Sequence, residues 1–84
     1  MPRASQKFEL TGTGFLHLRE LRGKEKPSER NVAEEHLLQL IVDGKDTAEE
    51  LKVAHPESWS KTMSRLRRMK RMNWIQGPGD DTEE

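Results

Sequence analysis

A basic, amphipathic segment at residues 58–75 constrains the fold of this chain more than any other feature. It contains six Lys or Arg residues and no Asp or Glu. On an α-helix, at about 100° per residue, its apolar side chains fall on one side and its basic side chains on the other. The apolar side holds Trp59, Met63 and Leu66, with Thr62 and Met69 at its edge. The basic side holds Lys61, Arg65 and Arg68, with Ser64 and Arg71 alongside. Such a helix buries one stripe and exposes the other, so the rest of the chain has to supply a core.

The charges of the chain alternate in sign from block to block, although they cancel to a net charge of zero. Residues 1–30 hold seven basic and four acidic residues, and residues 31–58 hold two basic and seven acidic residues. Residues 59–75 hold six basic and no acidic residues, and residues 76–84 hold four acidic residues. A basic helix face is most often only a solvated surface, but solvated faces usually mix both signs. A cationic strip without acids is instead typical of a helix that contacts nucleic-acid phosphates.

The length of 84 residues allows one small domain. With 31% hydrophobic and 36% charged residues, its core must be small, which favours marginal stability or dimerisation. The absence of cysteine excludes disulfides and thiolate metal sites. No apolar run is long enough to span a membrane and no signal peptide is visible. We therefore expect a cytoplasmic protein, associated with the nucleoid or the nucleus if it binds DNA.

The chain is predicted to form a single domain over residues 1–76, followed by an acidic tail. The domain has a flexible start at residues 1–7, an N-terminal strand or helix extension at residues 8–27 and a helix-turn-helix core at residues 28–76. Residues 77–84, GPGDDTEE, have no means of burying apolar surface and are predicted to be disordered. The tail is either a solubilising end or a competitor that folds back over the cationic strip.

The N-terminal extension contains one ambiguous segment. Residues 7–10, KFEL, suit a short strand that the following glycines end. Residues 15–22, FLHLRELR, permit either a short helix or a strand, because their leucines fit both periods. We favour the helix, with Thr11 or Thr13 as its cap. Its inner face is expected to hold Phe15, Leu18 and Leu21.

Two helices of the core are predicted from their caps and apolar spacing. The first begins with a capping box formed by Asn31 and Glu34 and ends at Gly44. The second, short helix at residues 48–54 opens with a capping box that starts at Thr47, and it ends before a proline.

The basic segment forms the last helix, residues 58–72, with Ser58 as its cap and Asn73 at its end. Residues 74–76 then suit a strand. The core is predicted to combine apolar positions from all three helices. These positions are Leu37, Leu40, Leu51, Met63 and Leu66, with Trp59 and Trp74 as further core anchors.

Residues 32–75 resemble the winged helix-turn-helix family in the order and the ends of these helices. The matching residues are Leu37, Leu40, Ile41 and Gly44, then Thr47, Ala48, Glu50 and Leu51, then Thr62, Met63, Ser64 and Arg65, and finally Leu66, Met69, Trp74 and Ile75. The resemblance implies a mostly α fold, a three-helix helix-turn-helix domain with a minimal or truncated β wing. The wing of that family needs a return strand after Ile75, which residues 77–84 cannot supply. Either the wing is absent, or residues 7–10 pair with residues 73–76.

The resemblance also implies a sequence-specific double-stranded DNA-binding protein, most simply a small transcriptional regulator with helix 58–72 as its recognition helix. The expected DNA-contacting residues are Ser58, Ser60, Lys61, Ser64, Arg65, Arg67, Arg68, Lys70 and Arg71. Arg side chains can pair with guanine edges, while Lys and Ser mainly hold phosphates. The small size resembles that of regulators carried by viruses, plasmids or other mobile elements. We expect a homodimer on a two-fold DNA site, joined through residues 8–21.

The alternative is a winged-helix protein–protein interaction module that acts as an adaptor in a larger assembly. We expect no enzyme, cofactor or small-molecule ligand, because the chain has no nucleophile–base pair and no glycine-rich phosphate loop. We also expect no metal site, because the three histidines are widely spaced. They are His17, His36 and His55.

Overall fold

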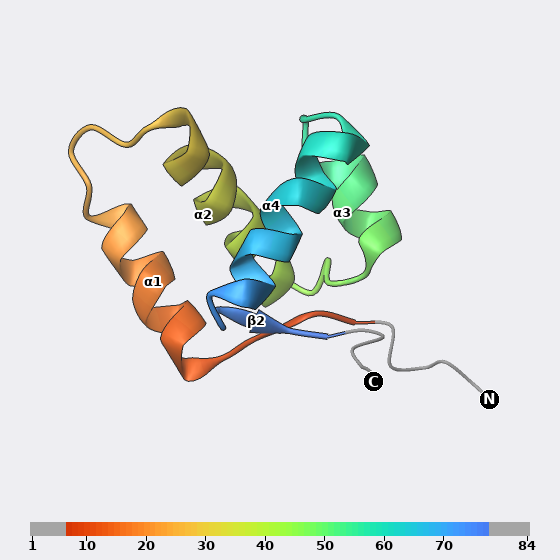
Figure 1. Ribbon diagram of the computed structural model, residues 1–84, viewed down its shortest axis with the longest axis horizontal. Coiled ribbons are helices and arrows are strands. Elements are labelled where there is room, and N and C mark those ends of the chain that lie inside the picture. The colour runs from red at the N-terminus through yellow and green to blue at the C-terminus, as the bar shows by residue number, and fades with distance from the viewer. Residues whose placement is uncertain (1–6, 78–84) are drawn as a thin grey trace.

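The computed structural model describes residues 7–77, which fold into four helices and a two-stranded sheet (Figure 1). In chain order the elements are β1 (Glu9–Leu10), α1 (Gly12–Arg22), α2 (Glu29–Val42), α3 (Ala48–Ala54), α4 (Trp59–Arg71) and β2 (Ile75–Gln76). Helix α2 packs against each of the other three helices. The prediction of a mostly α fold with a minimal β sheet is confirmed.

Helix α1 contains the ambiguous residues 15–22, as favoured, and starts earlier, at Gly12. Thr11 is its cap, since the threonine hydroxyl oxygen accepts a hydrogen bond from Gly14 N at 2.9 Å. The same hydroxyl donates to Asn73 O at 2.6 Å, and Thr11 N donates to Trp74 O at 3.0 Å. The start of α1 is therefore bonded to the chain that leaves α4.

The inner face of α1 differs from the predicted one at one position. Leu18 and Leu21 are buried as expected, but Phe15 and Leu16 are exposed. Gly14 takes the inner position instead, because its backbone packs directly against the carbonyl group of Trp74. No side chain has room at this contact, so α1 turns Gly14 inward and the next residue, Phe15, lies on the surface.

The start of α2 corrects the predicted capping box. The helix begins at Glu29 with Ser28 as its cap, about one turn before the expected start. Ser28 Oγ accepts from Asn31 N at 3.1 Å, and Asn31 Oδ1 accepts from Ser28 N at 3.0 Å, so the two residues form a reciprocal capping box. Glu34, the predicted partner of Asn31, is buried instead, because its carboxylate has partners on α1 and α4.

The other helix ends lie where the sequence predicts them. Thr47 caps α3 and Ser58 caps α4, each through its side-chain oxygen. Gly44 after α2 and Asn73 after α4 have φ angles of 97° and 65°. These angles lie in the left-handed region, which glycine and asparagine tolerate better than other residues.

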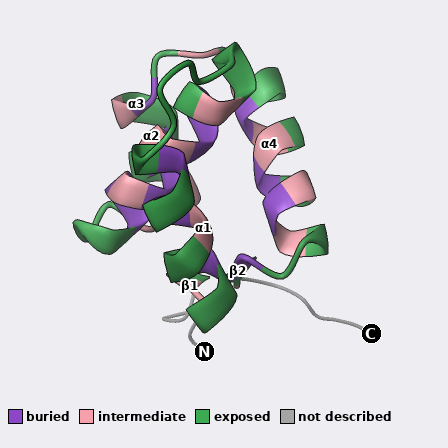
Figure 2. Ribbon diagram, turned by 90° about the vertical axis from the view of Figure 1, so that its left-hand side faces the viewer, coloured by how far each residue is buried: buried purple, intermediate pink, exposed green. Residues whose placement is uncertain are grey.

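The core lies between the four helices and the sheet, and Figure 2 shows the buried residues on the inward sides of the helices. It consists of Phe8, Leu18, Leu21, Leu37, Leu38, Leu40, Ile41, Leu51, Leu66, Met69, Trp74 and Ile75. Four of the five predicted core positions are therefore confirmed, and so is Trp74. Met63 and Trp59 are wrong as core residues, since both are only half-buried.

These two misplacements share one cause, a rotation of α4 about its axis. The buried residues of α4 are Thr62, Leu66 and Met69. Their stripe lies about 60° around the helix from the predicted one. Thr62 can occupy an interior position because its hydroxyl donates to Ser58 O at 2.9 Å. With that group bonded, the residue presents its methyl group to the core.

The sheet decides between the two alternatives for the wing. β1 pairs with β2 in antiparallel fashion, with Glu9 opposite Gln76 and Leu10 opposite Ile75. The two residues before β1 contact residues 46–47: Lys7 forms a bridge with Thr47, and Phe8 N donates to Asp46 O at 2.7 Å. The N-terminal strand thus supplies the pairing partner that residues 77–84 cannot.

Parts of two predicted segments lie outside the described residues. These are residues 1–6 of the flexible start and residues 78–84 of the acidic tail. None of the helices between residues 7 and 77 has the length and apolar character needed to cross a membrane.

Gly14 provides a test of the contact between α1 and the exit of α4. Gly14→Ala should lower the free energy of unfolding by about 1–3 kcal/mol, because the added Cβ would collide with Trp74 O. Gly12→Ala is the matched control, since a Cβ there meets no atom, and it should leave stability unchanged or raise it by up to about 1 kcal/mol. Urea unfolding of both variants provides the comparison. Equal midpoints for the two variants would contradict the contact.

Candidate nucleic-acid interface

Six of the nine predicted DNA-contacting residues are exposed on α4 or at its cap. They are Ser58, Ser60, Lys61, Ser64, Arg67 and Arg71. Residues 60, 64, 67 and 71 follow one another at intervals of three or four and so lie in one row along the helix. Figure 2 shows this outer side of α4 turned away from the other helices. We call Ser60, Lys61, Ser64, Arg67 and Arg71 the basic strip.

Arg65, Arg68 and Lys70, the other three predicted residues, are half-buried. The helical projection placed Arg65 and Arg68 at the centre of the exposed basic face, and this placement is wrong. The rotation of α4 turns both arginines toward carboxylates on neighbouring parts of the chain. Their contact with DNA stays a prediction.

Arg68 is bound by a buried carboxylate on α2. Arg68 Nε donates to Glu34 Oε2 at 3.1 Å, and the Glu34 side chain is only 1% exposed. The other oxygen, Glu34 Oε1, lies 3.2 Å from Nε2 of His17 on α1. The His17 ring stacks on Trp74 with centroids 3.5 Å apart, and the Arg68 guanidinium carbon lies 5.5 Å from the centroid of the same indole. Glu34 therefore connects α1, α2 and α4.

Arg65 is bound by Glu57 in the turn between α3 and α4. Arg65 Nε donates to Glu57 Oε1 at 2.6 Å and Nη2 donates to Oε2 at 2.7 Å, which makes the ion pair bidentate. The hydrogen bonds from Arg65 lower the pKa of Glu57 from 4.5 to about 2. The hydrogen bonds to Glu57 in turn raise the pKa of Arg65. The pair stays charged at neutral pH and fixes the turn to the first half of α4.

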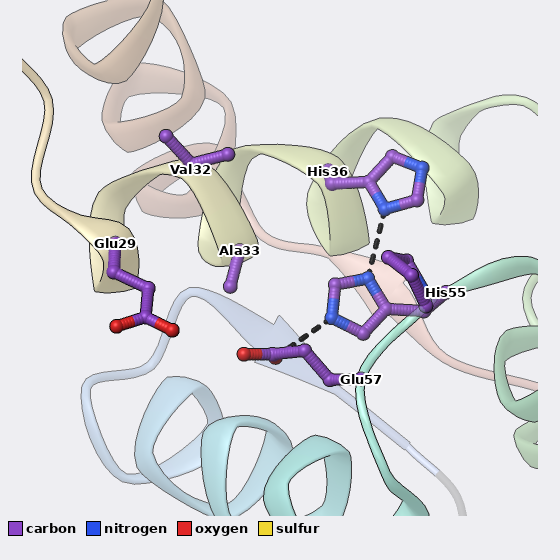
Figure 3. A pocket seen from close by; sticks show the side chains of 7 residues that line it. Glu29, Val32, Ala33, His36, His55 and Glu57 are labelled. Carbon is purple, nitrogen blue, oxygen red and sulfur yellow. Dashed lines mark hydrogen bonds and ion pairs between the residues drawn. The ribbon is translucent and has the colours of Figure 1, made fainter.

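Two histidines extend this ion pair to α2 (Figure 3). His55 Nε2 lies 2.8 Å from Glu57 Oε1, and His55 Nδ1 lies 2.8 Å from Nδ1 of His36. The ring centroids are 5.0 Å apart, so the two nitrogens lie between the rings and face each other. Burial, and then the nearby His55, lower the pKa of His36 from its ordinary value of 6.5. His55 itself is buried.

The histidine chain lies along an open groove of about 580 Å³. The groove is lined by Glu29, Val32, Ala33, His36, His55, Pro56 and Glu57. Within residues 7–77, no three His, Asp or Glu side chains are arranged to hold a metal ion. The groups along the groove can accept and release protons, and the facing nitrogens are positioned to share one.

Trp59 and Met63 form an apolar flank beside the basic strip. They line a second groove, of about 380 Å³, together with Phe8, Ala48, Leu66, Arg67 and Lys70. Lys52 Nζ lies 6.0 Å from the centroid of the Trp59 ring, within reach of a cation–π interaction. Trp59 therefore lies between the core and the surface that the basic strip occupies.

The sequence analysis did not predict the residues that position α4. One of them, Glu34, could have been found from its place in the sequence. Glu34 precedes Leu37, Leu38 and Ile41 by three, four and seven residues, so it lies on the apolar face of α2. A carboxylate on such a face requires a hydrogen-bonding or cationic partner from another part of the chain. No comparable local signal exists for His36, His55 and Glu57.

In comparisons with protein families, with curated proteins and with solved structures, nothing matches this chain.

The Arg68–Glu34 pair leads to a prediction about stability. Arg68→Ala should lower the free energy of unfolding by about 2–4 kcal/mol, because it leaves a buried carboxylate without its cation. Arg67→Ala removes the same charge from the neighbouring, exposed position and should change stability by less than about 0.5 kcal/mol. Both values follow from urea unfolding at neutral pH. A stable Arg68→Ala variant would show that the pair does not hold α2 and α4 together.

The Glu57–Arg65 pair leads to a prediction about pH. Because the pKa of Glu57 is lowered from 4.5 to about 2, its contribution to stability is complete above pH 4.5 and is lost as the pH falls through 2. Glu57→Gln should therefore destabilise the chain at neutral pH, by about 1–3 kcal/mol, and the difference from the unchanged chain should shrink in acid. Unfolding measured across this range, with the exposed Glu49→Gln as control, gives the comparison. A difference that does not vary with pH would contradict the ion pair.

Proposed function

We propose that this chain is a small sequence-specific double-stranded DNA-binding protein, a transcriptional regulator of the winged helix-turn-helix kind, with α4 as its recognition helix. The observation that supports this most is the composition of the exposed side of α4. Its basic strip contains only Ser, Lys and Arg, and the helix has no acidic residue. Ser and Lys bind phosphates, and Arg binds phosphates or guanine edges. Such a protein would act in the cytoplasm, at the nucleoid or in the nucleus.

The dimensions of α4 suit the major groove of DNA. The basic strip spans residues 60–71, which is about 16 Å along a helix, and the major groove is about 12 Å wide and admits an α-helix. Arg67 lies in the middle of the row of exposed residues and is the best placed for a guanine edge. Lys61 and Arg71 lie toward the two ends of the strip, where phosphates flank the groove.

The internal ion pairs of Arg65 and Arg68 support the same proposal. Both arginines are bound to carboxylates of the chain itself, so they position α4 instead of adding freely to its outer charge. The exposed cations of α4 are then Lys61, Arg67 and Arg71 of the basic strip. A rigid helix with its charge on one side has the organisation needed to enter a groove in a single orientation.

We also propose that the chain binds DNA as a homodimer joined through α1. Phe15, Leu16 and Val42 are 54%, 61% and 45% exposed, although they are large apolar residues. Phe15 and Val42 line a groove of about 280 Å³ whose rim carries Glu9 and Asp46. If two α1 helices crossed in antiparallel fashion at residues 15–16, the basic end of each helix would lie near the acidic rim of the other copy. A two-fold dimer would double the DNA contact of a very small domain.

Removal of the cations of the basic strip tests DNA binding. Lys61→Ala, Arg67→Ala and Arg71→Ala combined should weaken binding to random duplex DNA. Affinity falls as salt is added, and each lost phosphate contact should make the plot of log affinity against log salt less steep by about 0.9. Titration of labelled duplex at two salt concentrations measures both effects. Selection of bound sequences from the random pool then measures specificity.

The matched control removes three exposed cations outside α1 and α4, with Lys24→Ala, Lys26→Ala and Arg30→Ala. This variant should retain the affinity and salt slope of the unchanged chain. An equal loss in both triple variants would mean that binding follows net charge and not α4. Failure of the unchanged chain to bind duplex DNA would favour the alternative, a winged-helix protein–protein interaction module.

Sedimentation tests the dimer. The unchanged chain should dimerise in a concentration-dependent manner, and Phe15→Ser combined with Leu16→Ser should be a monomer with the same helical content. Val53→Ser is the control, since Val53 on α3 is 87% exposed and lies outside the α1 groove. A chain that stays monomeric at all concentrations would rule against the dimer.

A further inference from the structure

The contact between His36 and His55 requires one hydrogen between two facing nitrogens. An imidazole nitrogen donates when it carries a proton and accepts when it does not. At 2.8 Å, one Nδ1 atom must donate and the other must accept. His55 also lies 2.8 Å from the Glu57 carboxylate, which only accepts, so His55 Nε2 carries a proton. In the neutral pair, His55 Nδ1 is therefore the acceptor and His36 Nδ1 is the donor.

This arrangement tolerates one added proton but not two. With one added proton, one ring carries hydrogen on both nitrogens and its Nδ1 donates to the unprotonated Nδ1 of the other ring, so the hydrogen bond persists. With a second added proton, both Nδ1 atoms are donors and both rings are positively charged. Two donors cannot share a hydrogen bond, and like charges at this distance repel.

We propose that the His36–His55 contact is a proton-operated latch that holds the turn between α3 and α4 against α2 and so regulates the proposed DNA interface. The latch is closed while the two rings share at most one added proton, and it opens when both are protonated. Opening releases the turn, and with it the first half of α4, where Ser60, Lys61 and Ser64 lie. The inference rests on the proposed function only for its effect on DNA.

The groups around His36 determine the direction of the pH effect. His55 and Glu57 face it from the turn, Glu29 lines the same groove from α2, and Arg65 on α4 interacts with both carboxylates. Burial and His55 lower the pKa of His36 from 6.5. Below pH 6.5 the open state therefore takes up the proton at His36 before the closed state does. The closed latch is most stable above that pH and loses stability as the pH falls.

As the pH falls, the His36–His55 contact opens before Glu57 is protonated. Arg65 lowers the pKa of Glu57 to about 2, so the Glu57–Arg65 pair is intact in the range where His36 takes up its proton. The turn and the first half of α4 remain joined through this pair. They are expected to move as one unit relative to α2.

Amide hydrogen exchange of the full chain without DNA tests the latch between about pH 7.5 and pH 5. After correction for intrinsic exchange, the opening constant for residues 55–61 should rise by up to about tenfold per pH unit, as expected for one linked proton. The rise should begin near pH 6.5 and level off where the His36 ring signal of the closed chain titrates in NMR spectra of the same sample, because the open state takes up the proton first. Its absence in the unchanged chain would overturn the latch.

His36→Gln removes the titration and keeps a side chain that can hydrogen-bond to His55. The pH-dependent rise in opening should disappear in this variant and persist in the control Glu49→Gln. The same rise in His36→Gln would also overturn the latch. If His36→Gln does not fold, the agreement between ring titration and opening in the unchanged chain decides the question.

Duplex binding at constant ionic strength tests the regulatory effect. Acidification should weaken DNA binding of the unchanged chain and should weaken that of His36→Gln less. An equal change in both chains, or tighter binding of the unchanged chain in acid, would contradict regulation by the latch. If neither chain binds duplex DNA at any pH, the proposed function fails, while the exchange experiment still decides whether the latch exists.

Discussion

The buried carboxylate of Glu34 is the constraint on which the arrangement of the helices depends. A carboxylate that is 1% exposed is costly to bury unless it is paired, and the partners of Glu34 come from two other helices. Arg68 reaches it from α4 and His17 from α1, and both lie against the ring of Trp74. Satisfying this group therefore sets the rotation of α4. The same rotation decides which cations of α4 face solvent, so a buried carboxylate determines the composition of the outer surface.

The helix ends could be predicted from sequence because their causes are local. Thr47, Ser58, Gly44 and Asn73 act on backbone groups within a few residues of themselves, and the structure bears out all four. The rotation of α4 could not be predicted in this way. A helical projection weighs only the helix's own side chains, and it ranks Met63 above Thr62 as a buried residue. Which side chains of α4 are buried is determined instead by partners that are distant in the sequence.

The residues of the candidate site also divide into those whose direction the local sequence predicts and those whose direction depends on distant contacts. The outward direction of Lys61, Arg67 and Arg71 is consistent with the unbroken basic pattern of the segment. The inward direction of Arg65 and Arg68 depends on two carboxylates that only the folded chain brings near them. His36 and His55 are 19 residues apart and have no common motif, so their contact could be found only from the packing of the turn against α2.

The position of β1 has a topological consequence. β1 pairs with β2, and the two residues before β1 contact residues 46–47, so this segment joins parts of the chain as far apart as Glu9 and Gln76. Closing so long a loop carries an entropic cost, which the packing of the helices between the two strands offsets. Lys7 and Gly77 leave the sheet side by side. The first and the last described residues therefore lie next to each other at the sheet. A short linker between Lys7 and Gly77 would convert the two strands into a hairpin. A circularly permuted chain with its new ends at another turn should then keep the fold.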